Sequence, residues 1–207
     1  PIEDVTGTLG GELLITIMDL RNMTIARDKV LFDGHAVAAV AATTPEIAEQ
    51  ALELITVDYE ILPPVERAVD AMKLGASVLH ENLFTRSLGE RATEASNVAA
   101  YIESIRGDIN DGFAEADLVH ETTYETLMVH QGYIEPTCAT AWAQADGRTS
   151  VWTSNQGTFG LRRSLSDLLD LPLDKINVIP MEVGGAFGGK IYAILEPLAI
   201  VLSRKAG

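Results

Sequence analysis

Cysteine is nearly absent from this 207-residue sequence, in which Cys138 is the single example. One thiol cannot form a disulfide within the chain, and it cannot alone hold zinc or an iron–sulfur cluster, which take several thiolates. Disulfide frameworks and metal centres built only from this chain's thiolates are therefore excluded. The scarcity of cysteine also fits a reducing compartment, and we expect a cytoplasmic protein.

Long apolar runs and an N-terminal leader are also missing. No stretch approaches the roughly 20 apolar residues that a transmembrane helix needs, so we expect no membrane contact. The chain begins with Pro1, Ile2 and Glu3, without the basic start and apolar run of a signal peptide. The missing initiator Met indicates a trimmed or excerpted chain.

Basic residues are half as numerous as acidic ones, with 15 Lys and Arg against 30 Asp and Glu, giving a formal net charge of −15. Nucleic acid is excluded as a partner because phosphate binding needs concentrated positive charge. The same charge disfavours an anionic cofactor unless backbone N–H groups of a glycine-rich loop or a helix start attract it locally. Solubility alone is the simpler explanation of the acidity.

Hydrophobic spacing predicts an α+β fold of two mixed α/β units, because helices do not follow strands one for one. We assign residues 1–70 to the first unit, 71–96 to a polar, irregular linker and 97–207 to the second unit. Thr44 and Pro45 are typical of a helix start and predict a helix as far as residue 55. Apolar patterns in the first unit predict strands at residues 13–17, 30–32, 37–40 and 57–61.

A hairpin gives the strongest structural signal in the second unit. Asp146 and Gly147 separate two apolar-polar stretches, and the Asp-Gly pair is typical of a tight turn between strands. Those stretches are residues 137–145 and 149–153. We further expect a short helix at 111–117, strands at 118–129 and 176–179, a helix at 159–169 and another at 192–202. Pro197 should kink that last helix or shift its start.

Residues 183–190, VGGAFGGK, are the first candidate for chemistry. Four glycines in six residues let a ligand approach the backbone closely. Residues 184–190 also have most of the spacing of a phosphate-binding P-loop and lie between a predicted strand and a predicted helix. However, Ile191 stands where that loop needs a Ser or Thr to hold magnesium. A degenerate P-loop of a nucleotide-binding module and a simple glycine-rich turn both stay open.

Residues 153–160, TSNQGTFG, are the second candidate because they follow a predicted strand and open a predicted helix. A helix start offers unpaired N–H groups and a partial positive charge to an anion. Gln156 adds both an amide donor and a carbonyl acceptor. The alternative interpretation is a capped surface helix whose Arg162 and Arg163 are solvated.

The order of three segments resembles one known family. VWTSNQGTFGLRR at residues 151–163, followed about twenty residues later by VGGAFGGK, resembles the paired signature of the molybdopterin-binding large subunit of molybdenum hydroxylases. This is the xanthine dehydrogenase and aldehyde oxidase family. QGYIEP at residues 131–136 fits it, and residues 27–65 resemble the a/b hammerhead domain that precedes the molybdopterin-binding domain. The resemblance therefore implies a hammerhead-like domain followed by the first part of a molybdopterin-binding domain.

The resemblance implies an oxidoreductase that acts on an aldehyde or an aromatic heterocycle, with water as the oxygen source. It implies a molybdenum–molybdopterin cofactor, iron–sulfur and FAD partner subunits or domains, and the remaining molybdopterin-binding part. By resemblance, Gln156, Gly185, Ala186, Phe187 and Gly188 bind the cofactor. Among them Gln156 and Phe187 lie near molybdenum without ligating it.

The sequence departs from the family pattern in two residues and in its extent. Ala186 stands where the family's commonest loop has a third glycine. Ile191 stands where purine-oxidising members have a Glu, which argues against a purine substrate. The family's catalytic Glu lies downstream of Gly207, so we expect no catalytic residue in this chain and no activity from it alone; a non-catalytic scaffold is the remaining alternative. If the resemblance holds, Gln156 and Phe187 should converge on one concave site at the end of two adjacent parallel strands.

Overall fold

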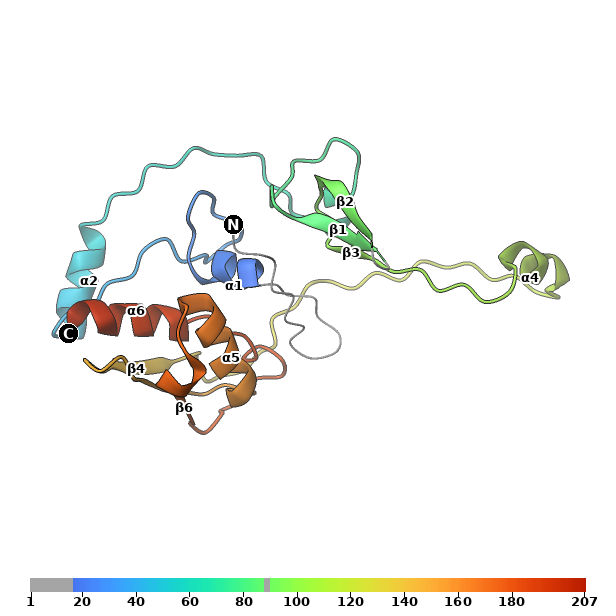
Figure 1. The fold of residues 1–207 in the computed structure, drawn as a ribbon. Coiled ribbons are helices and arrows are strands. Elements are labelled where there is room, and N and C mark those ends of the chain that lie inside the picture. The colour runs from blue at the N-terminus through green and yellow to red at the C-terminus, as the bar shows by residue number, and fades with distance from the viewer. Residues whose placement is uncertain (1–16, 88–89) are drawn as a thin grey trace. The chain divides into compact units, whose positions relative to one another are not determined.

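The computed structural model describes residues 17–87 and 90–207, and Figure 1 shows the helices and strands. The described residues form two compact units, one within Pro1–Thr56 together with Val129–Gly207 and the other within Val57–Met128. Helices and strands are mixed in both, which confirms the expected α+β class. The compact units do not follow the order of the sequence, and the assignment of separate domains to residues 1–70 and 97–207 stays a prediction.

The first unit contains a three-stranded sheet in the order β4-β5-β6. Strands β4 (Ala139–Ala143) and β5 (Thr149–Thr153) form the predicted antiparallel hairpin, and Gly147 takes the positive φ of 85° that suits such a turn. Strand β6 (Ile176–Pro180) pairs with β5 in parallel. The chain therefore leaves β5 and β6 at the same edge of the sheet.

Two helices cover one face of this sheet in Figure 1. Helix α5 (Thr158–Leu169) connects β5 to β6 through the short 3-10 turn η1 (Leu173–Lys175), and α6 (Glu196–Ala206) ends the chain. Their apolar faces meet the sheet in one core. That core consists of Val151, Leu161, Leu165, Ile176, Ala193 and Ile200. Burial of these side chains holds the two parallel strands, and hence the loops that follow them, in fixed relation.

Arg162 joins helix α5 to strand β6, and Pro197 sets where helix α6 begins. The Arg162 guanidinium donates to the backbone oxygens of Leu173 and Ile176, so it ties α5 to the start of β6 and is not solvated as the alternative interpretation had it. Arg163 is exposed, in line with that interpretation. Pro197 lies in the first turn of α6, which confirms that it shifts the helix start, since the helix was expected from residue 192.

Helices α1 (Ile17–Thr24) and α2 (Pro45–Glu53) belong to the same unit. Helix α1 packs on α5 and buries Leu20 almost completely. Helix α2 starts as predicted, because the Thr44 side chain accepts a hydrogen bond from the backbone nitrogen of Ile47 at 3.3 Å.

The second unit holds a smaller sheet in the order β2-β1-β3. Its elements are α3 (Ala68–Ala71), β1 (Phe84–Ser87), β2 (Glu90–Ala95), β3 (Ala100–Tyr101) and α4 (Ile109–Glu115). The side chain of Asn97 joins this unit by accepting from the backbone nitrogen of Leu79 at 2.8 Å and donating to the oxygen of Ser77 at 2.9 Å. The stretch expected to be irregular, residues 71–96, thus contains two strands, and α4 matches the short helix expected at 111–117.

Four predicted strands are wrong, because the structure has no strand in those ranges. They are residues 30–32, 37–40, 57–61 and 118–129. An alternating pattern shows which side chains share a face, but a strand also needs a neighbouring strand with which to exchange hydrogen bonds. The predicted strand at 13–17 falls largely outside the described residues, and Ile17 begins helix α1 instead. In the described ranges no helix is long and apolar enough to cross a membrane.

Candidate functional site

Two loops begin at the same edge of the first unit's sheet. Strand β5 ends at Thr153 and leads into the glutamine loop, which we define as residues 154–157. Strand β6 ends at Pro180 and leads toward the glycine loop, defined as residues 184–190. The backbone nitrogen of Met181 donates to the oxygen of Thr153 at 3.0 Å, so the two chains are still joined as they leave the sheet. Parallel pairing therefore brings the loops together, as the sequence predicted.

Direct hydrogen bonds then join the two loops to each other. The Gln156 backbone nitrogen donates to the Lys190 oxygen at 2.9 Å. The Lys190 backbone nitrogen donates to the Gln156 side-chain Oε1 at 3.2 Å. Asn155 adds a third bond, from its Nδ2 to the oxygen of Ile191 at 3.3 Å. The structure thus connects Gln156 to the glycine loop that carries Gly185, Ala186, Phe187 and Gly188, although 34 residues separate Gln156 from Lys190.

These contacts determine how the Gln156 amide is oriented. Its oxygen is occupied by the Lys190 N–H, so the other amide atom, Nε2, is left as a donor. Within the described part of the chain Nε2 makes no hydrogen bond, and the side chain is exposed. Gln156 therefore offers a free hydrogen-bond donor to whatever binds beside it.

The glycine loop has a backbone shape that depends on its glycines. Gly185 and Gly188 have φ of 90° and 91°, a region that residues with a side chain rarely occupy. The Gly189 nitrogen donates to the Ala186 oxygen at 2.8 Å and closes a turn. Ala186 itself has no positive φ and is buried, so its methyl group is accommodated where the family's commonest loop has a glycine.

Phe187 combines strain with exposure. Its φ of 49° lies in the left-handed region, which costs a non-glycine residue roughly 1–2 kcal/mol. The residue is 74% exposed, so packing within the chain does little to offset that cost. Strained backbone positions cluster at binding and active sites, so Phe187 is a candidate binding residue.

Glu135 and Tyr133 also belong to the site, although the sequence reasoning assigned them no role. Glu135 Oε2 accepts from Lys190 Nζ at 2.5 Å and from the Gly184 backbone nitrogen at 2.9 Å. The Lys190 ammonium lies 4.9 Å from the centre of the Tyr133 ring, and its side chain is only 1% exposed. The positive charge of Lys190 is therefore neutralised inside the protein. In the sequence the QGYIEP segment stands out only through the family resemblance, and nothing in its composition indicates a contact 55 residues away.

The ion pair changes the acidity of Glu135. The hydrogen bond from Lys190, and next the one from the Gly184 N–H, lower the pKa of the Glu135 carboxyl below its ordinary value of 4.5. Glu135 is accordingly ionised at neutral pH and holds Lys190 as a charged pair.

Two glycines at the ends of the loop allow close packing. A Cβ atom at Gly184 would lie 2.8 Å from Glu135 Cβ, and one at Gly189 would lie 2.6 Å from Tyr133 Cε1. By contrast, a Cβ atom at Gly188 would meet nothing within 4 Å. The loop therefore packs on the QGYIEP segment at both ends and presents open backbone at Gly188.

The nucleotide-binding alternative does not fit this geometry. A P-loop would direct Lys190 into its own cradle and would leave Gln156 uninvolved. Instead Lys190 is buried against Glu135, and Gln156 bonds to the loop backbone. Ile191 supplies no hydroxyl for magnesium.

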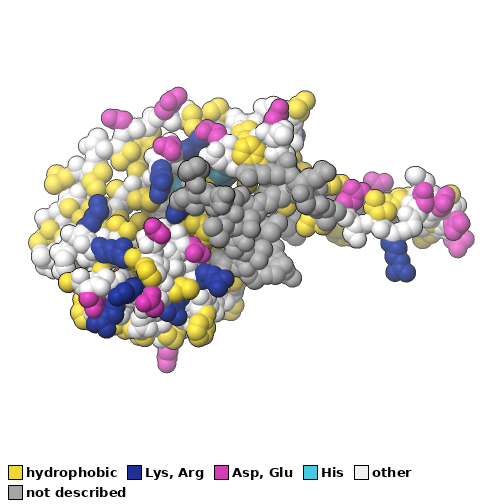
Figure 2. All heavy atoms as spheres, in the orientation of Figure 1, with side chains coloured by type: hydrophobic (Ala, Val, Ile, Leu, Met, Phe, Trp, Pro, Cys, Tyr) yellow, Lys and Arg dark blue, Asp and Glu magenta, His cyan; other side chains and the backbone are white. Residues whose placement is uncertain are grey.

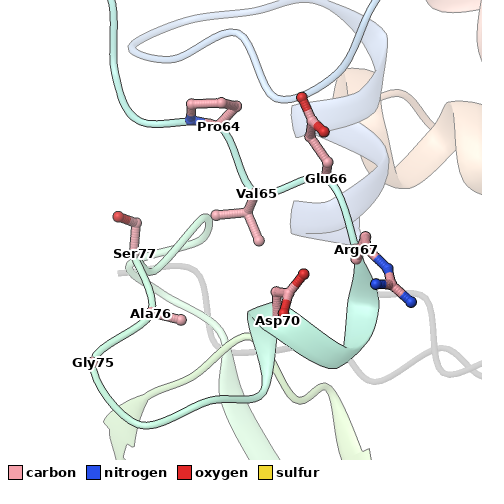
Figure 3. Close-up of a pocket in the computed structure, with 8 residues that line it drawn as sticks. All are labelled: Pro64, Val65, Glu66, Arg67, Asp70, Gly75, Ala76 and Ser77. Carbon is pink, nitrogen blue, oxygen red and sulfur yellow. The ribbon is translucent and has the colours of Figure 1, made fainter.

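A separate concavity lies in the second unit (Figure 3). Its lining residues are Pro64, Val65, Glu66, Arg67, Asp70, Gly75, Ala76 and Ser77. Glu66 and Arg67 point away from the Gly75–Ser77 side, and Arg67 and Asp70 already have partners in Glu125 and Lys73. None of its residues belongs to the glycine or glutamine loop, and we assign it no chemistry.

Charged and apolar side chains share the visible surface, and acidic side chains gather around α4 at the right of the view (Figure 2). This fits the chain's acidic balance. Among the residues that the structure describes, no three His, Cys, Asp or Glu side chains are grouped closely enough to hold a metal ion. A metal at this site would therefore need ligands from outside these side chains.

The donor set of the two loops suits a cofactor rich in acceptor atoms. The open glycine backbone admits a group that must approach closely, and the Gln156 Nε2 atom is a neutral donor. Lys190 cannot serve as a free cation, so attraction of an anion falls to backbone N–H groups and the start of α5. The residues present thus fit a molybdopterin group whose metal is held by its own dithiolene.

Comparison with known proteins supports this fit. Residues 91–207 match the family described as molybdopterin cofactor-binding domain, and residues 2–63 match the aldehyde oxidase and xanthine dehydrogenase a/b hammerhead domain. A probable xanthine dehydrogenase subunit of Bacillus subtilis is 33% identical over 88% of this chain and 23% of its own length. The nicotinate dehydrogenase large molybdopterin subunit of Eubacterium barkeri is 30% identical over 86% of this chain and 42% of its own.

A solved structure gives the same answer for the fold. The reconstituted CO dehydrogenase from Oligotropha carboxidovorans superposes with a TM-score of 0.74 and 29% identity, over 89% of this chain and 23% of that one. The chain spans about a quarter of the length of that protein and of the Bacillus subtilis relative. The expected order of a hammerhead domain followed by a molybdopterin-binding domain is confirmed. With more than half of its length matched, the chain belongs to the molybdopterin cofactor-binding domain family of the aldehyde oxidase and xanthine dehydrogenase type.

Proposed function

We propose that this chain is part of the molybdopterin-binding subunit of a molybdenum hydroxylase that oxidises an aldehyde or an aromatic heterocycle, with water as the oxygen source. One observation carries the proposal: the pair of hydrogen bonds that joins Gln156 to Lys190 at 2.9 and 3.2 Å. These bonds bring together two segments that the resemblance assigns to one cofactor site. The family match over both loops supports the same interpretation.

Each part of the site has a role in this proposal. Gly185 and Gly188 shape a backbone that the cofactor can approach closely, and Gln156 directs its Nε2 donor toward an acceptor of that group. Phe187 places an exposed ring beside the space that cofactor and substrate would share. When bound, the molybdenum–molybdopterin group supplies the two-electron redox chemistry, and the protein supplies position and polarity.

The proposal extends to partners that complete the enzyme. Electrons leave through iron–sulfur and FAD subunits or domains, and the remaining molybdopterin-binding part supplies the catalytic Glu and the rest of the cofactor cradle. The names of the Bacillus subtilis and Eubacterium barkeri relatives support a multi-subunit assembly, since both describe subunits of a larger enzyme. A cytoplasmic location is part of the proposal, on the evidence of the single cysteine.

Metal and pterin analysis of the full-length protein tests this function. We expect about one molybdenum and one pterin per subunit, and Gln156→Ala should lower turnover of an aldehyde or heterocycle panel by about a hundredfold, in the range of a lost donor beside a reacting centre. Asp146→Asn, at the exposed turn of the β4–β5 hairpin, serves as the control. Full-length protein without molybdenum or pterin would overturn the proposal in favour of a folded scaffold.

A further inference from the structure

We propose that Glu135 and Lys190 are positioning residues, whose ion pair locks both ends of the glycine loop and fixes the Gln156 amide as a donor toward a hydrogen-bond acceptor of the cofactor. The inference rests on the proposed function, because it names how that same site is held. It concerns only side chains and backbone of this chain, so it is testable apart from turnover.

The first step is that one carboxylate oxygen contacts both ends of the loop. Glu135 Oε2 accepts from the backbone nitrogen of Gly184, the first loop residue, and from Nζ of Lys190, the last. Both are charge-assisted hydrogen bonds, which are stronger than bonds between neutral groups. The intervening glycines have little intrinsic preference for one shape, so these anchors restrict the loop.

The second step is the burial of Lys190. Its side chain is 1% exposed, against 36% for Glu135, so the cation depends on the pair more than the carboxylate does. The Tyr133 ring at 4.9 Å adds a weaker attraction. Loss of the Glu135 charge would leave an ammonium group buried without a counter-ion, which is strongly unfavourable.

The third step connects the pair to Gln156. With Lys190 held in place, its backbone N–H points at the Gln156 side chain and its oxygen at the Gln156 backbone nitrogen. A flipped amide would set its NH₂ group against that N–H, two donors facing each other. The locked lysine therefore selects the orientation in which Nε2 remains available.

Hydrogen exchange in the full-length protein tests the lock. Glu135→Gln, Lys190→Met and the double variant are compared by mass spectrometry, following the amides of residues 184–190 and 154–157. Each single variant should exchange at least about tenfold faster in both loops, the effect of losing one charge-assisted hydrogen bond. The double variant should be more protected than Glu135→Gln alone, because Lys190→Met removes the uncompensated cation.

The relative exchange rates of the double variant and Glu135→Gln distinguish a positioning ion pair from two side chains that only fill space. If the residues only fill space, the double variant will be at least as exposed to exchange as either single variant. Asp146→Asn, which removes a carboxylate from the exposed pair with Arg148 in the same unit, should leave both loops unchanged. If Glu135→Gln does not yield folded protein, Glu135→Asp keeps the charge, shortens the reach and should show the same faster exchange.

Gln156→Glu tests the donor itself. A glutamate keeps an oxygen for the Lys190 N–H but has no Nε2 donor, so loop exchange should stay within about twofold of the parent while molybdenum and pterin content falls several-fold. Unchanged exchange in Glu135→Gln and Lys190→Met, or undiminished cofactor content in Gln156→Glu, would overturn the inference. A parent protein that lacks molybdenum and pterin would overturn the proposed function and the donor role, while the exchange data would still decide whether the lock exists.

Discussion

At the scale of single residues, substitutions of Phe187 distinguish its effect on stability from its role in binding. Its positive φ is a cost that glycine would relieve, and its exposed ring contributes little to the core. We expect Phe187→Gly to be more stable than Phe187→Ala by about 1 kcal/mol, since both remove the ring and only glycine suits the backbone. Urea unfolding of the two variants measures the difference.

The same pair of variants bears on the role of the ring. Both should lower cofactor content or kcat/KM of the full-length enzyme to a similar extent, because both lack the aromatic group. Equal stability of the glycine and alanine variants would show that the backbone at residue 187 is unstrained.

Ionisation of Glu135 makes the stability of the glycine loop depend on pH, with lower stability at acidic pH. Its pKa is lowered in the folded protein, chiefly by the hydrogen bond from Lys190 and then by that from Gly184. The stability it contributes is therefore present above the ordinary pKa of 4.5 and is lost as pH falls below that value through the lowered pKa. We expect opening of residues 184–190, corrected for intrinsic exchange, to be constant from neutral pH down to about 5 and to increase only below it. Glu135→Gln should abolish that increase, and an increase that begins near pH 6 would exclude Glu135 as its source.

At the scale of elements, Arg162 joins α5 to β6. It donates to two backbone oxygens, at 3.1 Å to Leu173 and 2.8 Å to Ile176 from Nε. Arg162→Lys keeps the charge but not the planar, multiple-donor geometry, so we expect a loss of about 1–3 kcal/mol in unfolding free energy. Arg163→Lys, at the exposed neighbouring position, should change it by less than about 0.5 kcal/mol. Similar chemical-denaturation curves for the two variants would contradict this role.

A second prediction at the scale of elements concerns Gly189, near the end of the glycine loop. Gly189→Ala would place a Cβ atom 2.6 Å from Tyr133 and 3.1 Å from the Ala186 oxygen, so the loop and the QGYIEP segment must separate. We expect a loss of about 1–3 kcal/mol in the unfolding free energy of the first unit. Gly112→Ala, in α4 where a Cβ meets nothing within 4 Å, should be neutral or slightly stabilising.

The sequence predicted the elements whose signals are local. The Asp146-Gly147 turn, the Thr44 cap and the glycine loop after β6 all combine a residue preference with its neighbours, and the structure has each of them. Residues 118–129 show where local patterns fail: their alternating pattern predicts a strand, but the structure has no strand there. Within the site, the meeting of the two loops followed from parallel strands. The Glu135–Lys190 contact did not, because it joins residues 55 apart and depends on tertiary packing alone.

At the scale of the whole molecule, we expect the cofactor site to need more protein than this chain supplies. The chain spans about a quarter of the length of the Bacillus subtilis relative, and the family's catalytic Glu is expected beyond residue 207. We expect purified residues 1–207 to contain no molybdenum and to oxidise neither aldehydes nor purines. Elemental analysis and a dye-reduction assay check this, with the full-length protein as the positive control. Stoichiometric metal or measurable turnover in the short chain would contradict it.

The packing of α1 on α5 has a consequence for synthesis on the ribosome. Arg21 and the Asp167 oxygen that it contacts are 146 residues apart, and Leu20 lies on the same helix, which packs on α5. At 5–20 residues per second, translation leaves about 7–30 seconds in which α1 has emerged and its partner has not. During that interval α1 lacks its contacts with α5 and is open to chaperones and to other nascent chains. The first unit is therefore completed late in translation, although part of it is made first.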